Sequence, residues 1–352
     1  MVTLSVVVPV YQVEDYLRQC LDSIRAGLSD AENAAVQVVA VDDASPDRSG
    51  AMADAYAAEH GGMTVVHLER NVGLGLARNA GLAEATGDYI WFVDSDDWLP
   101  AGSVKAVLDA LDEHAPDVLL VDHLRAHEDG RCEVDASSHL LAGPATLERM
   151  LGVQHTAWNR IVKREFLERN ELRFRAGWYE DVSFSHPVLL AAEKIATLDR
   201  VCYYYRIGRS GAITATRSDR HFEAFEQYED LLRWAAARDI DPARRAQLFT
   251  LMISHLLVVV GNEGRMHPSR RRPFFRKTAA FYRRHRPAGY APPGGMKGLK
   301  HRLVAVDSYL LYSLLRAGYR VAGRLRRGTE RTPSVSSDLA PASPSAQTTS
   351  IL

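Results

Sequence analysis

The chain has 352 residues, of which 46% are hydrophobic and 25% are charged, and its formal net charge is −1. This length and composition predict a globular protein with a sizeable core and room for two domains. The three cysteines, at positions 20, 132 and 202, form no CxxC spacing, which excludes a zinc knuckle and a disulfide framework.

The first half of the chain alternates strand and helix patterns. Continuous apolar runs, typical of strands buried on both faces of a parallel sheet, cover residues 4–8, 36–41, 64–68 and 89–93. Amphipathic patterns predict helices over 14–28 and 74–85, and Ser45 followed by Pro46 predicts another helix start. This alternation indicates a doubly wound, mostly parallel α/β sheet.

The second half is predicted to be more helical. Strands are expected over 117–121 and 201–207, and helices over 146–151, 161–169, 181–195, 221–261 and 301–327, with a loop over 287–298. The Ser-, Thr- and Pro-rich tail over 328–352 is predicted to be disordered.

Acidic residues gather where the predicted parallel strands end, and ligands of such sheets bind at that edge. The run Asp94-Ser95-Asp96-Asp97 directly follows an apolar strand. Three carboxylates packed there repel one another unless a cation lies between them. Oxygen ligands suit Mg²⁺ or Mn²⁺, which also bridge the oxygens of a diphosphate, so we expect Asp94 and Asp96 to hold one of these metals. A solvated acidic turn is the alternative.

The other strand ends supply groups that suit a nucleotide. Tyr11, which follows Pro9, offers an aromatic ring that can stack on a base. The carboxylates of Asp42 and Asp43 can accept hydrogen bonds from a base N–H or a ribose hydroxyl.

The segment from Asn71 to Asn79 joins the third predicted strand to a helix. Glycines at positions 73 and 75 permit close backbone approach, and Arg78 lies in the first turns of the helix, where the helix dipole also favours anions. A tight loop and a surface salt bridge are the alternatives. The segment lacks the third glycine of a dinucleotide fingerprint and the Lys-Ser/Thr of a P-loop, so neither site is predicted.

Four motifs stand in order along this half: Val8-Pro9-Val10-Tyr11, Val41-Asp42-Asp43-Ala44-Ser45, Asn71-Val72-Gly73 with Ala77-Arg78-Asn79-Ala80-Gly81, and Phe92-Val93-Asp94-Ser95-Asp96-Asp97. With them the chain resembles the family 2 glycosyltransferases of the GT-A fold, and is similar to bacterial transferases of cell-envelope polysaccharide and wall teichoic acid. The resemblance implies a GT-A catalytic domain over 1–215, with a nucleotide-binding half (1–105) and an acceptor half (106–215). A helical, basic C-terminal region over 216–327 and the tail over 328–352 follow it.

The resemblance also implies a binding site for a nucleotide sugar, with a UDP-sugar expected. Its residues are Pro9, Tyr11, Glu14, Asp42, Asp43, Asn71, Gly73, Arg78, Asp94, Ser95, Arg206 and Ser210. Asp94 and Asp96 would form the DxD pair at the ribose and the metal. The stretch from Tyr203 to Arg206, followed by Ser210, is similar to the family segment that closes over the diphosphate, where Arg206 can clamp phosphate; an aromatic core strand is the alternative.

Glu180-Asp181 matches the Glu-Asp pair whose aspartate is the catalytic base in related wall-polymer transferases. Inversion at the anomeric carbon needs one base to take the proton of the acceptor hydroxyl. A helix start keeps Asp181 ionised, while adjacent Glu180 raises its pKa. An ordinary acid at a helix start is the alternative.

The expected function is therefore inverting, metal-dependent sugar transfer to a cell-envelope polysaccharide or teichoic-acid-like acceptor, which can be a glycan, a polyol phosphate or a lipid-linked chain. A nucleotidyltransferase would need a Gly-rich basic loop after the first strand, and that place holds Pro9 to Glu14. A non-catalytic nucleotide- or glycan-binding protein is the other alternative, against which the intact carboxylates argue.

The C-terminal region is strongly basic, with 17 Lys and Arg against two acids from residue 265 to 330. Arg316, Arg320 and Arg324 recur every four residues opposite leucines, which predicts an amphipathic helix in peripheral contact with an anionic membrane. Packing on the catalytic domain or on another subunit are alternatives, and without a nucleic-acid module no nucleic-acid partner is expected.

No secretory signal and no membrane span are expected, because the N-terminus lacks a basic region and the apolar run over 256–260 is short. The predicted location is the cytoplasm, with contact at the inner face of the cell membrane.

Overall fold

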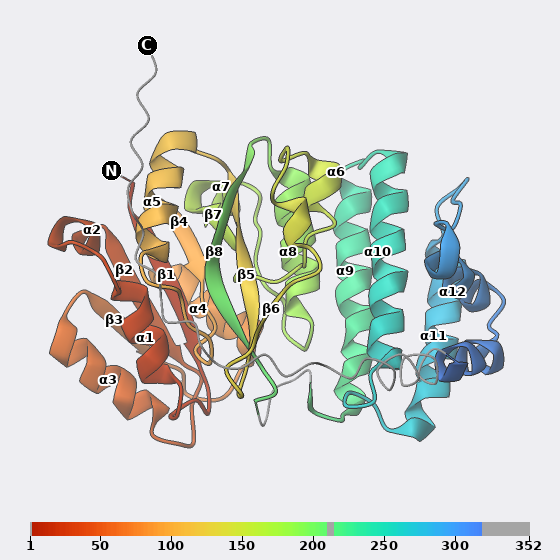
Figure 1. Cartoon of the computed structure of the whole chain (residues 1–352), viewed down its shortest axis with the longest axis horizontal. Helices are drawn as coiled ribbons and strands as arrows, with labels where there is room; N and C mark the ends of the chain where they lie inside the picture. The colour runs from red at the N-terminus through yellow and green to blue at the C-terminus, as the bar shows by residue number, and fades with distance from the viewer. Residues whose placement is uncertain (1, 210–214, 319–352) are drawn as a thin grey trace, which may run out of the picture. The chain divides into compact units, whose positions relative to one another are not determined.

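The computed structural model describes residues 2–209 and 215–318 (Figure 1). The chain divides into two compact units, residues 1–307 and 308–352. In the second unit, residues 309–318 are helical up to the limit of the described residues. Ser210, the predicted helix beyond residue 318 with Arg320 and Arg324, and the predicted disordered tail lie outside the described residues.

The first unit is built on a sheet with the strand order β3-β2-β1-β4-β7-β5-β6, in which β8 also pairs with β5. The strands are β1 (Leu4–Val10), β2 (Val36–Asp42), β3 (Met63–His67), β4 (Tyr89–Phe92), β5 (Val118–His127), β6 (Cys132–Val134), β7 (Arg160–Lys163) and β8 (Ile195–Ile207). β1 to β4 pair in parallel, as do β5 and β8, whereas β6 and β7 run antiparallel to their neighbours. The predicted α/β class with a mostly parallel sheet is confirmed.

Helices cover both faces of this sheet because neighbouring side chains of each strand point to opposite faces. Val6 and Val8 pack in one core cluster with residues of α1 (Leu17–Arg25), α3 (Ser49–His60) and α5 (Ser103–His114). Val7 and Val39 pack in a second cluster with residues of α4 (Leu74–Glu84), α7 (Arg164–Arg169) and α8 (Glu180–Ala191). The runs that form β1, β2 and β4 are therefore buried on both sides, as predicted, whereas β3, at the end of the sheet order, is only half-buried.

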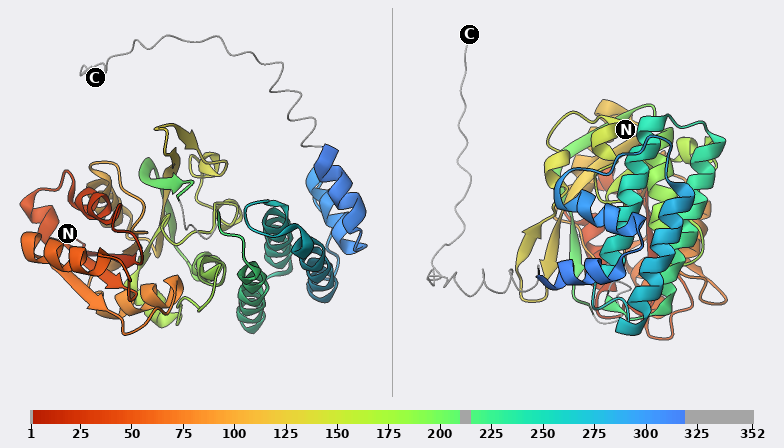
Figure 2. Two further views of the ribbon diagram at one scale, coloured as in Figure 1. Left: turned by 90° about the horizontal axis from the view of Figure 1, so that it is seen from below. Right: turned by 90° about the vertical axis from the view of Figure 1, so that its right-hand side faces the viewer.

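Shorter helices lie between these elements, namely α2 (Asp30–Ala34), α6 (Leu147–Met150), and the 3-10 turns η1 (Ser138–Leu140) and η3 (Asp219–Glu223). Four longer helices follow the sheet: α9 (Ala224–Ala237), α10 (Pro242–Gly261), α11 (Pro268–His285) and α12 (Gly295–Ala305). They lie beside the sheet region in Figure 2, and α9 contacts α8.

α10 is the one helix in the described part of the chain that is long and apolar enough to cross a membrane, with a mean hydropathy of 1.3. The run over 256–260 is thus part of a longer apolar helix than its sequence suggested. Length and composition alone are weak evidence, because the core helix of a globular protein meets the same criteria. α10 buries 44% of its apolar window and contacts α9, α11 and α12.

The helix predicted to start at Ser45 and Pro46 begins instead at Ser49. Asp42 Oδ1 accepts the backbone N–H of Ser45 at 2.9 Å, and Asp47 Oδ1 accepts that of Ser49 at 3.1 Å. These carboxylates hold the segment in turns before the helix begins.

Three other predicted elements are wrong in detail. The start of the helix predicted over 161–169 belongs to β7, because pairing with both β4 and β5 overrides local propensity. The helix predicted over 221–261 is broken near Asp239, where φ is 48°, and Asp241 then caps α10. The helix predicted over 301–327 is interrupted at Asp307, where φ is 52°, and α12 begins inside the predicted loop.

Candidate active site

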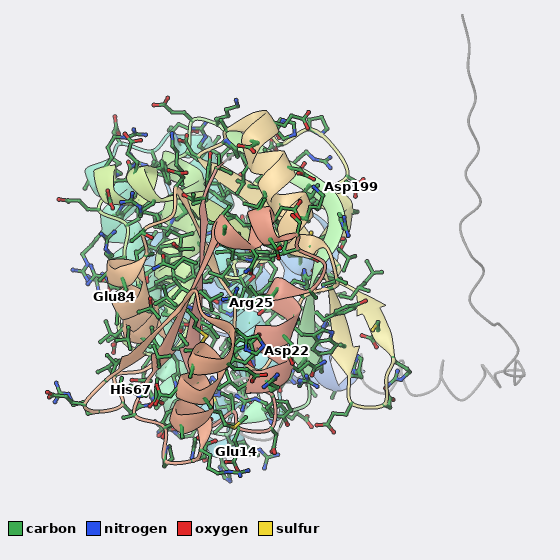
Figure 3. The ribbon with its side chains drawn as sticks, turned by 90° about the vertical axis from the view of Figure 1, so that its left-hand side faces the viewer. Glu14, Asp22, Arg25, His67, Glu84 and Asp199 are labelled. Carbon is green, nitrogen blue, oxygen red and sulfur yellow. The ribbon has the colours of Figure 1, made fainter. Side chains whose placement is uncertain are left out.

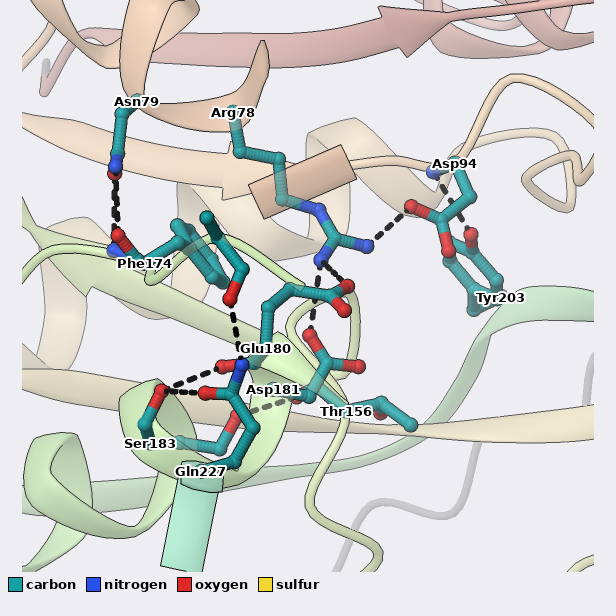
Figure 4. Close-up of polar contacts among 12 residues, drawn as sticks. Arg78, Asn79, Asp94, Thr156, Phe174, Glu180, Asp181, Ser183, Tyr203 and Gln227 are labelled. Carbon is teal, nitrogen blue, oxygen red and sulfur yellow. Dashed lines mark hydrogen bonds and ion pairs between the residues drawn. The ribbon is translucent and has the colours of Figure 1, made fainter. Parts of the chain in front are cut away.

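A buried arginine, Arg78, joins three carboxylates from two distant parts of the chain (Figure 4). Its Nη2 lies 2.6 Å from Asp94 Oδ1, and its Nη1 lies 2.8 Å from Glu180 Oε1 and 2.9 Å from Asp181 Oδ1. The Arg78 side chain is 1% exposed, whereas Asp94 and Asp181 keep 21% and 22% of their side chains exposed. The guanidinium therefore lies buried within an acidic site, in which the carboxylates of Asp94 and Asp181 remain accessible.

The local backbone explains why these groups meet. Asp94 follows β4, and α4 carries Arg78 from an N-cap at Gly73, whose φ of 88° favours glycine. Glu180 and Asp181 occupy the first turn of α8. A Cβ on Gly75 would lie 2.4 Å from a backbone oxygen and 3.0 Å from the Glu180 Cβ, so the glycine permits α4 to approach the start of α8.

The same burial changes the acidity of the Glu-Asp pair. Burial raises the pKa of Glu180, the Asp181 charge raises it further, and Arg78 opposes both effects. Burial also raises the pKa of Asp181, and Arg78 again opposes the shift while Asp94 adds to it. A carboxylate whose pKa is raised accepts a proton more readily, which suits a general base.

The Asp94–Asp97 run divides into outer and inner carboxylates. Asp97 is 1% exposed and accepts hydrogen bonds from the Tyr203 hydroxyl and the Arg206 backbone N–H, both at 2.7 Å. Burial raises the pKa of Asp97, and the Asp96 and Asp94 charges add to the shift. Asp97 is therefore a structural anchor for β8, which leaves Asp94 and Asp96 as the outward pair.

Arg206 is fixed by contacts on several sides. Its Nε donates to the Asp96 carbonyl at 2.7 Å, and its Nη2 donates to Gln19 Oε1 at 2.8 Å. The guanidinium carbon also lies 4.7 Å from the Tyr16 ring and 4.6 Å from the Trp98 ring. The predicted phosphate clamp thus stands beside the acidic run, held against the first helix.

The nucleoside end of the predicted site is organised by Asp42 and Asp43. Asp43 accepts the backbone N–H groups of Val72 at 2.7 Å and Gly73 at 2.9 Å, which fixes the segment before α4. Asp42 Oδ2 lies 3.0 Å from His67 Nδ1. Burial raises the pKa of Asp43 despite these hydrogen bonds.

The remaining predicted residues lie around this end. Tyr11 is 40% exposed, as a stacking ring requires, whereas Pro9 and Ser95 are buried. Glu14 accepts two hydrogen bonds at 3.1 Å from Arg48, through its backbone N–H and its Nε. Glu14 and His67 both lie toward the lower end of the molecule in Figure 3.

Two predicted roles need correction. Arg78 was expected to help neutralise a diphosphate, but its guanidinium is enclosed and faces three carboxylates. The Asp43 carboxylate was expected to contact the nucleoside, but both of its oxygens accept N–H groups of the protein's own segment. In each case the side chain contacts other groups of the protein and holds them in position.

Sequence reasoning missed His67 and Arg209, which the structure places at the site, and gave Tyr203 no role of its own. Tyr203 links Asp94 and Asp97, His67 bridges Asp42 and Asp54, and Arg209 Nε lies 2.7 Å from Asp96 Oδ2. The signal that could have found Arg209 is its position three residues after Arg206 in the same predicted segment.

A mostly parallel sheet with acidic strand ends is joined by one arginine to a Glu-Asp pair on a later helix, an arrangement similar to that of GT-A glycosyltransferases. Residues 5–165 match the family described as Glycosyl transferase family 2.

Two relatives are similar to this chain over part of their length. It is 31% identical over 213 residues to EpsJ, an uncharacterized glycosyltransferase of Bacillus subtilis (strain 168), covering 57% of this chain and 60% of EpsJ. It is 28% identical over 255 residues to TarS, a poly(ribitol-phosphate) beta-N-acetylglucosaminyltransferase of Staphylococcus aureus (strain Mu50 / ATCC 700699), covering 70% of this chain and 43% of TarS. The chain thus spans less than two thirds of either relative.

A solved structure shows the shared fold. The crystal structure of S. aureus TarS 1-349 in complex with UDP superposes with a TM-score of 0.64 at 22% identity, over 95% of this chain and 94% of that one.

Proposed function

We propose that the protein is an inverting, metal-dependent glycosyltransferase that moves a sugar from a UDP-sugar to a hydroxyl of a cell-envelope polysaccharide or teichoic-acid-like polymer. The observation that carries this proposal is the Arg78 guanidinium, which holds Asp94 and Asp181 together. The donor diphosphate and the acceptor hydroxyl must meet at one anomeric carbon, so their binding groups need a fixed relation. The UDP complex of TarS and the polymer acceptor in the TarS name support the choice of substrates.

The outward carboxylates fit a divalent cation that is shared with the donor. Asp94 and Asp96 offer oxygen ligands and keep 21% of their side chains exposed, whereas Asp97 is enclosed. Within the described ranges no group of three His, Cys, Asp or Glu residues could hold a metal alone. Mg²⁺ is commonly bound by one or two carboxylates together with substrate phosphates, and Mn²⁺ accepts the same oxygen ligands. Such a cation would supply positive charge to the leaving diphosphate.

Asp181 is the base in this proposal, and Glu180 supports it. The Asp181 side chain is 22% exposed and can meet an acceptor hydroxyl, whereas that of Glu180 is 5% exposed. Arg78 holds Asp181 in place with a contact at 2.9 Å, and its charge opposes the rise that burial causes in the Asp181 pKa. When the hydroxyl attacks the anomeric carbon, Asp181 takes its proton, while Arg206 adds charge near the diphosphate.

The test is UDP release from a panel of UDP-sugars with a teichoic-acid-type polymer, with and without Mn²⁺ or Mg²⁺. Asp181→Asn should lower turnover about 10²- to 10⁴-fold, the usual contribution of a general base, and should keep UDP binding measured by calorimetry. Asp109→Asn, an exposed acid on α5, is the matched control and should leave turnover unchanged. UDP binding without turnover of any UDP-sugar would favour a non-catalytic nucleotide-binding protein instead.

We also propose that the protein acts in the cytoplasm and contacts the inner face of the membrane through its C-terminal unit. Leu310, Leu311 and Leu314 are 70%, 53% and 60% exposed on the helix over 309–318, which also carries Arg316. An exposed apolar stripe with basic neighbours suits an anionic lipid surface. The double substitution Leu310→Glu and Leu314→Glu should reduce flotation with anionic liposomes; unchanged flotation would contradict the contact.

A further inference from the structure

The outward acidic pair is already partly neutralised by a second arginine. Arg209 Nε lies 2.7 Å from Asp96 Oδ2, and the two side chains are 17% and 21% exposed. Asp94, two positions earlier, carries a like charge, so the Arg209 guanidinium offsets part of the negative charge of this pair.

The contacts of Arg209 are looser than those of its neighbour Arg206. Among the described residues, its Nε meets Asp96 as an ion pair, and its Nη1 donates to the Gln12 carbonyl at 3.3 Å. Its guanidinium carbon lies 5.8 Å from the Tyr16 ring. Arg206, by comparison, donates two side-chain hydrogen bonds at 2.7 and 2.8 Å. Arg209 is thus held mainly by charge, which another cation can replace.

We propose that Arg209 is the counter-ion of Asp96 before metal and donor bind, that a divalent cation competes with it for this carboxylate, and that the released guanidinium then binds the donor diphosphate. This inference rests on the proposed function. A metal ion and a guanidinium at one carboxylate repel each other, so the metal alone gains little by binding. With a diphosphate present, the phosphate oxygens offer ligands to the metal and a new partner to Arg209.

The arrangement makes metal and nucleotide binding mutually dependent. Each ligand removes a cost that the other would meet alone, so Mn²⁺ should tighten UDP binding and UDP should tighten Mn²⁺ binding by the same factor. Arg209 is a positioning residue before metal and donor bind, and it contacts the phosphate once both are bound.

The test measures Mn²⁺ binding to the whole protein by electron paramagnetic resonance, first with Mn²⁺ alone and then with UDP. Arg209→Gln should bind Mn²⁺ alone about tenfold more tightly than the wild type, because the competing positive charge at Asp96 is removed. The factor by which UDP tightens Mn²⁺ binding should fall at least as much. Arg209→Lys, which keeps the charge, should stay closer to the wild type in both measurements.

Arg131→Gln is the matched control, because Arg131 Nε also lies 2.7 Å from a carboxylate, that of Asp129, in an exposed hairpin. It should leave both Mn²⁺ measurements unchanged. If the wild type binds Mn²⁺ with UDP but Arg209→Gln shows the same affinities, the role of Arg209 is overturned and the proposed function stands. If no variant binds Mn²⁺ even with UDP, the metal assignment of the proposed function fails as well.

Discussion

Replacement of Arg78 by glutamine should be one of the most damaging single changes in the chain. The variant would leave Asp94, Glu180 and Asp181 close together with no cation among them. Loss of one partner from a buried ion pair typically costs about 3–5 kcal/mol, and the outer two carboxylates can recover part of the loss by hydration. We therefore expect Arg78→Gln to lower the free energy of unfolding by about 3–5 kcal/mol in total, rather than by this amount for each of the three contacts.

The loss should depend on pH with a definite sign. Without Arg78, the pKa values of Glu180 and Asp181 rise further above their unfolded values, which are about 4. A carboxyl group whose folded pKa is raised favours folding below its unfolded pKa, and this contribution is lost as the pH rises through the folded value. The stability of Arg78→Gln should therefore be closest to that of the wild type near pH 5 and furthest below it near pH 8.

Thermal unfolding followed by circular dichroism measures this difference. At pH 8 the Tm should fall by roughly 5–8 °C, since 1 kcal/mol corresponds to about 1.5 °C in a unit of 307 residues. Arg78→Lys should give an intermediate value, because one ammonium cannot serve three carboxylates equally. Arg164→Gln, which removes an exposed pair with Glu168 at 2.9 Å, should change the Tm little. An Arg78→Gln Tm equal to that of the wild type at both pH values would refute the reasoning.

Three further predictions follow from the site. Because burial raises the pKa of Glu180, the stability of the wild type should decline as the pH rises above about 4.3, and Glu180→Gln should flatten this decline. A series of Tm measurements from pH 5 to 9 tests this expectation, and parallel curves for the two proteins would contradict it. The hydrogen bond to Asp42 is the largest cause of the raised pKa of His67, so Asp42→Asn should lower the His67 pKa in an NMR titration, and no shift would exclude this pairing in solution. Gly75→Ala should lower the free energy of unfolding by about 1–3 kcal/mol and reduce turnover, because its Cβ would press α4 away from Glu180. Gly294→Ala, with open space around it, should have little effect on unfolding. Equal melting curves for the two variants would show that α4 and α8 tolerate separation.

Much of the sheet half could be predicted because its signals are local. Each of the first four apolar runs became a strand, and the acidic residues that follow β2 and β4 lie at the site. A continuous apolar run followed by acids is readable within a few residues. The same reasoning failed at β7, whose short segment becomes a strand only because β4 and β5 lie on either side of it.

The inner contacts of the site could not be predicted, because they join positions far apart in the chain. Arg78 looked like a ligand of phosphate, since a basic residue near a helix start often is one. Nothing in the spacing of residues indicates that α8 packs against α4 and presents Glu180 to it. The role of Asp97 as an anchor likewise could not be predicted, because it depends on Tyr203 of β8, which donates to its carboxylate.

The reach of Arg78 has a consequence for protein engineering. Two of its three partners lie 102 and 103 positions further along the chain, beyond residue 165, where the family match ends. A hybrid enzyme spliced at that boundary would inherit the guanidinium from one parent and two of its carboxylates from the other. Segments should therefore be exchanged between relatives only in pieces that carry α4 and the beginning of α8 together.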